Sequence, residues 1–224
     1  AHNNLGNAFK EQKEYEKAIP HYEKAININP NYFEAYNNLG VVFDKLKNYS
    51  EAEKALKKAI QLHPEFAEAY SNLGSVFTNQ KKYSQAIKYF DQAIKINPNN
   101  AEVYYNLGLA HNNKKEPKIA IYNYKKALRI TPYKVSYIKM LAITQDQIKN
   151  YDEAVFSYEK AININPNYFE AYNNLGVVFN KLKNYSKAEE ALKKAIQLHP
   201  EFAEAYSNLG SVFTNQKQYS QAIK

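Results

Sequence analysis

The 224-residue sequence contains no cysteine, no tryptophan and a single methionine. Without cysteine the chain has no disulfide, no thiolate nucleophile and no cysteine-ligated metal site. No apolar run approaches the ~18 residues of a membrane-spanning helix, so we expect no membrane partner. The chain begins Ala1-His2-Asn3-Asn4, without a basic segment followed by an apolar one, and we expect a cytoplasmic protein.

Arginine is scarce as well, although the chain is basic. Thirty lysines and arginines face 22 aspartates and glutamates, which gives a net charge of +8, but Arg129 is the single arginine. Arginine makes most of the bidentate contacts to bases and phosphates, whereas these lysines are spread along the chain in runs of two at most. We therefore expect no nucleic-acid partner.

A period of 34 residues runs through the whole chain. Prolines recur at this step at Pro30, Pro64, Pro98, Pro132, Pro166 and Pro200. Glycines recur at Gly6, Gly40, Gly74, Gly108, Gly176 and Gly210, with Ala142 in the one gap. Such a fixed period predicts a repeat architecture of stacked supersecondary units.

Within each unit, apolar residues come in two groups at helical spacing. In the second unit these are Tyr36, Leu39, Gly40 and Phe43, followed by Ala52, Leu56 and Ala59. Each group follows one face of a helix, and its small residues favour close approach of two helices. Pro64 then ends the second helix, so each unit is predicted to be a helix hairpin.

The order aromatic-x-x-Leu-Gly-x-x-aromatic, then Ala-x-x-x-aromatic or Leu, then Pro, resembles the tetratricopeptide repeat over the whole chain. The resemblance implies an all-α, right-handed superhelical solenoid whose first helices line a concave groove that binds proteins or extended peptides. We expect a single array, residues 1–224, with repeats at approximately 1–32, 33–66, 67–100, 101–134, 135–168, 169–202 and 203–224. The first and last of these repeats are incomplete.

The residue before each Leu-Gly pair projects differently from the core positions, and it is almost always asparagine. This ladder comprises Asn4, Asn38, Asn72, Asn106, Asn174 and Asn208, with Met140 as the exception. A carboxamide both donates and accepts, so it can hold a peptide backbone without reading its side chains. Specificity is then expected from the preceding positions, Asn3, Asn37, Ser71, Tyr105, Lys139, Asn173 and Ser207. The alternative is that the asparagines bond to neighbouring helices.

The ladder resembles that of the tetratricopeptide region of O-linked N-acetylglucosamine transferase, which holds extended protein substrates. A second hypothesis is therefore a substrate-recruiting segment of such an enzyme, with the catalytic domain outside this stretch. The carboxylate clamp of chaperone-binding relatives is missing here, because Lys139 alone offers a cation at the positions before the ladder.

A third hypothesis follows from a larger repeat. Residues 23–88 recur at 159–224 with four differences in 66 places, Asp44/Asn180, Glu51/Lys187, Lys54/Glu190 and Lys82/Gln218. Evolutionary duplication and deliberate construction both fit this pattern. A designed or self-associating array without a ligand would stack end to end through its terminal faces.

We expect no enzyme, no cofactor and no metal. The five histidines, His2, His21, His63, His111 and His199, fall at no ligand spacing, and no glycine-rich phosphate loop occurs. Carboxylates are paired with lysines along exposed helix faces, so no catalytic dyad can be singled out.

Two departures from the family pattern concern the turns and the fourth and fifth units. The turn inside each hairpin, which usually carries glycine at positive φ, has Lys13, Lys47, Lys81, Lys115, Lys149, Lys183 and Lys217. At aromatic packing positions the chain has His111 and Gln145, which predicts a weaker stack over residues 111–145. That stretch is interpreted either as a drifted unit or as a hinge.

Overall fold

The computed structural model describes residues 1–217, which form thirteen α-helices and no strand. The first seven are α1 (His2–Glu11), α2 (Tyr15–Ile28), α3 (Phe33–Lys45), α4 (Tyr49–Leu62), α5 (Ala67–Asn79), α6 (Tyr83–Ile96) and α7 (Ala101–Asn113). The others are α8 (Pro117–Ile130), α9 (Val135–Gln147), α10 (Tyr151–Ile164), α11 (Phe169–Lys181), α12 (Tyr185–Leu198) and α13 (Ala203–Asn215). The predicted second helix of the last repeat falls on residues 218–224, outside the described ones.

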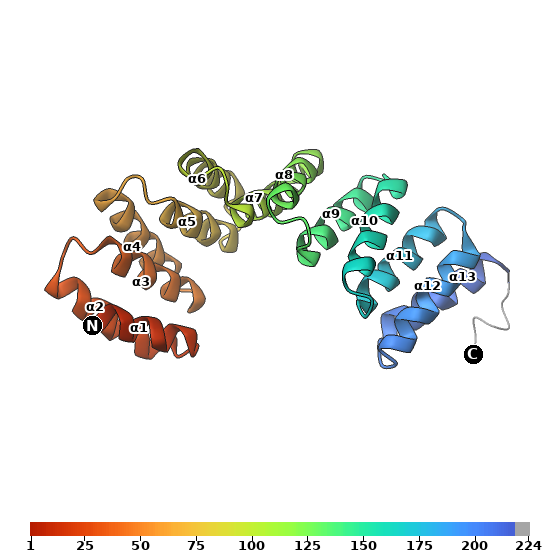
Figure 1. The fold of residues 1–224 in the computed structure, drawn as a ribbon, viewed down its shortest axis with the longest axis horizontal. Helices are drawn as coiled ribbons and strands as arrows, with labels where there is room; N and C mark the ends of the chain where they lie inside the picture. Colours follow the sequence, from red (N-terminus) through yellow and green to blue (C-terminus); the bar gives the residue numbers. More distant parts are fainter. Residues whose placement is uncertain (218–224) are drawn as a thin grey trace. The chain divides into compact units, whose positions relative to one another are not determined.

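The helices form two compact units, Ala1–Lys115 and Glu116–Lys224, each a stack of antiparallel helix pairs (Figure 1). Within a unit each helix packs against the next one along the chain. The predicted all-α fold of repeated helix hairpins is thus confirmed, while the repeat boundaries and the grouping into a single array remain predictions.

Each hairpin depends on a close approach at its glycine. A Cβ added to Gly40 on α3 would lie 2.6 Å from Leu56 Cγ and 3.2 Å from the Ala52 carbonyl oxygen on α4. Leu56 and Ala52 are fully buried. The two helices are therefore closer than any side chain at position 40 permits, as the small residues of the sequence predicted.

Lysine ends the first helix of every hairpin in the left-handed conformation. Lys47 has φ 61°, and the equivalent lysines have φ between 60° and 69°. The Asn48 N–H donates to the Phe43 carbonyl (2.8 Å), and the Lys47 N–H donates to that of Asp44 (2.9 Å). This is a Schellman motif with lysine in the usual glycine place.

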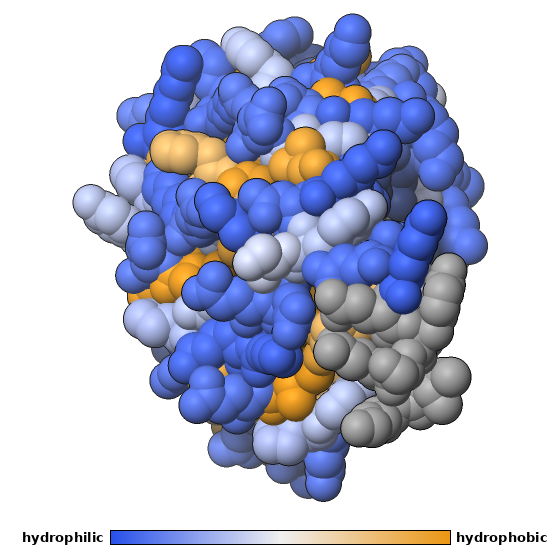
Figure 2. Space-filling model, turned by 90° about the vertical axis from the view of Figure 1, so that its right-hand side faces the viewer, coloured by the Kyte–Doolittle hydropathy of each residue, from blue (hydrophilic) through white to orange (hydrophobic). Residues whose placement is uncertain are grey.

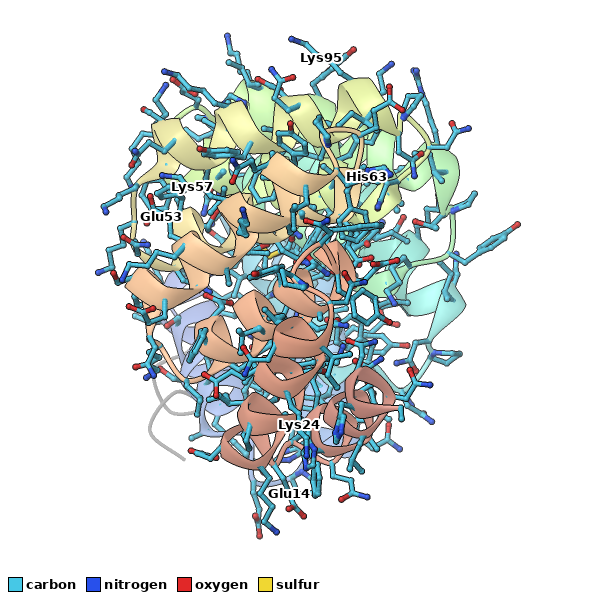
Figure 3. All side chains as sticks on the ribbon, turned by 90° about the vertical axis from the view of Figure 1, so that its left-hand side faces the viewer. Glu14, Lys24, Glu53, Lys57, His63 and Lys95 are labelled. Carbon is cyan, nitrogen blue, oxygen red and sulfur yellow. The ribbon has the colours of Figure 1, made fainter. Side chains whose placement is uncertain are left out.

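Aromatic residues fill the joints between hairpins of the first unit. His63 follows α4, with its ring centroid 4.5 Å from that of Phe33 and 6.2 Å from that of Phe66. Figure 3 labels His63 at the end of α4, whose exposed face carries the Glu53–Lys57 ion pair at 2.6 Å. His199 makes the same contacts with Phe169 and Phe202 in the second unit. These histidines are packing residues at the joints.

The fifth hairpin, α9 and α10, has a polar core contact in place of an aromatic one. Gln145 is 1% exposed. Its Oε1 accepts from Ser157 Oγ (2.7 Å), and its Nε2 donates to Glu153 Oε2 (2.8 Å). The buried amide is thus bonded through both polar atoms, which offsets its desolvation cost. Whether residues 111–145 act as a hinge stays a prediction.

Candidate functional site

The first helices of the hairpins lie on the inner side of each unit. In the first unit α1 contacts α3, α3 contacts α5 and α5 contacts α7, and in the second α9 contacts α11 and α11 contacts α13. Second helices of neighbouring hairpins make no comparable contact within the described part of either unit. The first helices are therefore closer together, and their exposed face is the concave one of each unit.

The ladder asparagines lie on these helices and are half-buried where they are hydrogen-bonded. Asn72 on α5 donates from Nδ2 to Asn37 Oδ1 on α3 (2.8 Å). Asn38 donates to Asn3 (3.3 Å), and in the second unit Asn208 donates to Asn173 (2.9 Å). Each bond joins residues 35 apart. The ladder is thus tied to the preceding first helix, as the alternative interpretation anticipated.

Asn37 and Asn173, which accept hydrogen bonds from the ladder, are buried, whereas we expected them to lie along an open groove. Asn37 is 2% exposed and Asn173 is 1% exposed. Each also donates to a carboxylate on the following first helix, Asn37 to Glu68 Oε1 (2.9 Å) and Asn173 to Glu204 Oε1 (3.1 Å). These two asparagines orient other side chains rather than face solvent, because a buried carboxamide needs partners at both ends.

Glu68 and Glu204 are members of the network that the sequence reasoning missed. The signal was present, because glutamate recurs with the period at Glu34, Glu68, Glu102, Glu170 and Glu204. The ladder, the buried asparagine and this glutamate together link consecutive first helices, and we call them the Asn–Glu network.

The remaining ladder residues have other surroundings. Asn4 is exposed. Asn106 is half-buried, and no side-chain hydrogen bond links it to another described residue. Asn174 Oδ1 accepts from Nδ2 of the adjacent Asn173 (3.3 Å). The ladder is therefore uneven, with some carboxamides fixed by neighbours and others open.

The positions before the ladder are equally varied. Asn3 is 7% exposed and accepts from Asn38. Ser71 and Tyr105 are half-buried, and Ser207 is exposed. The ammonium of Lys139 lies 5.6 Å from the centroid of the Tyr168 ring. The one cation of this set is thus held against an aromatic face within its own unit.

A bonded ladder residue still offers groups to a ligand. Asn72 uses one Nδ2 hydrogen on Asn37, which leaves its second hydrogen and its Oδ1. A peptide group presents one acceptor and one donor, which match those two atoms. The bond to Asn37 fixes the carboxamide orientation, so less rotamer entropy is lost on binding.

Residues 1–217 contain no group of three or more histidine, aspartate or glutamate side chains that could hold a metal ion. No helix among them combines the length and the apolar character needed to cross a bilayer. The face drawn in Figure 2 is mostly hydrophilic, with small hydrophobic patches between polar side chains.

Comparison with known families and structures gives a consistent result. Models described as tetratricopeptide repeat match residues 33–66, 67–100 and 169–202, and also 89–122 and 191–224. A model described as TPR repeat matches residues 6–47 and 147–183. No curated protein matches the sequence.

Solved structures share the fold. The TPR protein YrrB, described as having an unusual peptide-binding site, is 24% identical with a TM-score of 0.70, over 82% of this chain and 95% of its own. PilF of Pseudomonas aeruginosa is 22% identical with a TM-score of 0.78, over 96% of both chains. MamA is 29% identical with a TM-score of 0.65, over 71% of this chain and 94% of its own. With these matches and its repeated hairpins, the chain belongs to the tetratricopeptide repeat family, whose members bind proteins or peptides.

Proposed function

We propose that this protein is a non-catalytic scaffold that binds an extended peptide or protein segment on the concave face of its first helices. The observation that carries the proposal is the fixed orientation of Asn72 and Asn208 by the buried Asn37 and Asn173. A side chain already held in one rotamer loses little entropy when a ligand arrives. Ser71 and Ser207, beside the ladder, add small polar contacts.

The expected affinity is low. In the first unit the ladder comprises Asn4, Asn38, Asn72 and Asn106, and at roughly 0.5–1.5 kcal/mol for each hydrogen bond it contributes about 2–6 kcal/mol. Ordering an extended segment costs about 2–5 kcal/mol or more. The ladder alone therefore supports binding in the millimolar to micromolar range with little sequence preference.

A peptide-array screen followed by fluorescence anisotropy tests the ladder. Asn106→Ala is the cleaner variant, because Asn106 has no side-chain hydrogen bond to another described residue that the change would also remove. We expect Asn106→Ala and Asn72→Ala each to weaken binding of a selected peptide roughly 2- to 10-fold.

Asn27→Ala serves as the control, because Asn27 is exposed on α2, outside the ladder. Asn72→Ala also removes the hydrogen bond to Asn37, so its melting temperature is compared with that of the wild type. Weaker binding at an unchanged melting temperature would report loss of the ligand contact alone. Unchanged affinity in the double variant Asn72→Ala/Asn106→Ala would rule out the ladder as the binding element.

End-to-end self-association is a second candidate, favoured by one exposed leucine. Leu5 on α1 is 44% exposed, whereas the equivalent Leu39, Leu73 and Leu107 are at most 7% exposed. A first helix of a second copy could pack against α1 and cover Leu5, in the way that α1 packs against α3 and α3 packs against α5. Light scattering over a concentration series should show association that Leu5→Lys abolishes, and a strict monomer at all concentrations would exclude it.

The segment of an O-linked N-acetylglucosamine transferase-like enzyme remains a third proposal. It shares the peptide-binding face, and it adds a catalytic domain in the same polypeptide. Sequencing the parent transcript past Lys224 tests it, because a nucleotide-sugar domain must follow if the proposal holds.

We also propose that the hairpins act as one array, which pulling or hydrogen-exchange measurements on the whole chain would test.

A further inference from the structure

The repeat provides an internal reference for what the fold requires at each position. The residues at one place on the second helices α2, α4, α6 and α12 are Pro20, Lys54, Lys88 and Glu190. In α8 and α10 this place holds Tyr122 and Phe156, which are 59% and 70% exposed. Since the other hairpins form with proline or a charged residue there, these two exposed aromatic side chains are not needed for folding.

A cavity of about 590 Å³ lies beside Phe156, between α8, α9 and α10. Leu128 of α8 and Ile138 and Leu141 of α9 line its apolar part. Gln145, fixed by Ser157 and Glu153, forms part of its wall. The cavity therefore has a preformed apolar interior with an aromatic side chain at its edge.

This cavity lies away from the ladder. On α9 it uses Ile138, Leu141 and Gln145, whereas the ladder position is Met140. At 100° per residue, Met140 lies about 100° around the helix from Leu141. A ligand in the cavity would thus occupy a surface other than the concave face.

The charges around the cavity favour an anionic partner. Lys125, Arg129 and Lys160 line it, as do Asp152 and Glu153. Glu153 is already bonded to Lys125 (3.1 Å) and to Gln145 (2.8 Å). The guanidinium of the chain's single arginine and the Lys160 ammonium are then balanced by Asp152 alone. The equivalents of Arg129 in the other described second helices are Asn27, Gln61, Lys95, Asn163 and Gln197.

We propose that this cavity is a second docking surface, which binds an acidic segment of a partner protein. An apolar side chain of that segment enters between Leu128, Ile138 and Leu141 and packs on Phe156, while a neighbouring carboxylate pairs with Arg129 and Lys160. Aromatic and arginine side chains are the residues that most often dominate protein interfaces. A second copy of this chain is disfavoured as the occupant, because both copies carry a net charge of +8.

Fluorescence anisotropy with labelled synthetic peptides tests this surface. The ligand peptide alternates aspartate and leucine, one control alternates aspartate and serine, and another alternates lysine and leucine. A mixed-sequence single-stranded oligonucleotide completes the set. We expect only the aspartate–leucine peptide to bind well, and its affinity to fall as salt is added, because the carboxylate contacts are screened.

Variants that restore the common residue of the repeat locate the binding. In Tyr122→Lys/Phe156→Lys and in Arg129→Gln each new residue is one that other second helices carry at the same place, so folding should be retained. We expect at least a tenfold loss of affinity in the double variant and a several-fold loss in Arg129→Gln. Lys54→Ala, at the equivalent place on α4, should leave affinity unchanged.

Several results would overturn the proposal. These are absence of binding by the wild-type protein, equal binding of the aspartate–serine peptide or of the oligonucleotide, and undiminished affinity in the double variant with its circular dichroism spectrum intact. A dimer that the double variant dissociates would instead assign the surface to a second copy. Loss of binding in Asn72→Ala but not in the double variant would place the peptide on the ladder.

Discussion

The helices α3 to α5 and the helices α8 to α10 pack consecutively in the same way but make different polar contacts. In α3 to α5 the Asn–Glu network ties consecutive first helices, through Asn37, Asn72 and Glu68. In α9 the ladder position is Met140, and the buried hydrogen bonds are inside the hairpin, from Gln145 to Ser157 and Glu153. Both regions form complete hairpins with the same turn, so either set of polar contacts is compatible with the fold.

One contact between first helices is common to both regions. Near the ends of the helices Asn79 donates to Asp44 (2.9 Å), and in the second unit Lys181 donates to Asp146 (2.7 Å). The residues are 35 apart in each case. The contact near the ends of consecutive first helices is therefore shared by the two regions.

The largest expected effect concerns the close approach inside the hairpin. Gly40→Ala places a Cβ 2.6 Å from Leu56 Cγ, a branched atom that cannot move away without shifting the helix. We expect a loss of about 2–3 kcal/mol in the free energy of unfolding, measured by urea denaturation. The fifth hairpin already has alanine at this place, Ala142, so Ala142→Gly should cost only about 1 kcal/mol through helix propensity. A gain in stability in Ala142→Gly, instead of this small loss, would mean that the fifth hairpin has the same close helix separation as the second.

The buried amide of the fifth hairpin gives the next effect. Gln145→Phe restores the aromatic residue of the regular repeats but leaves Ser157 Oγ and Glu153 without their amide partner. We expect a loss of about 2 kcal/mol, because Ser157 is buried and a lone buried hydroxyl keeps its desolvation cost.

Adding Ser157→Ala should recover most of that loss, since Ala55 and Ala191 occupy the equivalent place in the second and sixth hairpins. A double-mutant cycle measures the recovery. If the double variant were no more stable than Gln145→Phe alone, the polar contact would not be the reason for the lower stability.

The sequence was sufficient for the hairpins and insufficient for the roles of the asparagines. Gly40 and the turn lysine Lys47 act within one hairpin, where spacing along the chain fixes which side chains meet. Asn37 and Asn38 are adjacent in sequence, yet one is buried and bonded to Glu68 and the other is half-buried. Which of them faces solvent depends on the rotation of α3 against α5, a property of the stacked helices that periodicity alone does not fix.

Alkaline pH distinguishes the regions through a buried tyrosine. The second hairpin has Leu56 opposite its glycine, whereas the fifth has Tyr158 at the equivalent place, and Tyr158 is 2% exposed. Burial, together with the nearby charge of Asp146, raises the pKa of Tyr158. The folded protein therefore keeps this proton above pH ~10, where the unfolded chain releases it, and the stability decreases by about 1.4 kcal/mol per pH unit above that value.

Tyr158→Phe should make this decrease smaller, as monitored by urea unfolding between neutral and alkaline pH. Tyr22→Phe is the matched variant in the first unit, because burial and then Glu11 raise the pKa of Tyr22 to about 12. An unaltered pH slope in Tyr158→Phe would mean that its hydroxyl ionises as easily in the folded protein as in the unfolded chain.

The smallest effect should be the same in both regions, because both have the same turn. Lys47 and Lys149 each have φ 61°, a conformation that costs a residue with a Cβ roughly 1 kcal/mol relative to glycine. Lys47→Gly and Lys149→Gly should each stabilise the protein by up to about 1 kcal/mol, with a rise in melting temperature. The Schellman bonds, such as Asn48 N–H to the Phe43 carbonyl, are between backbone atoms and survive the change. A gain at Lys47 with none at Lys149 would show that the fifth hairpin holds its turn by contacts of the lysine itself, and the two regions would then differ in their turns as well as in their polar cores.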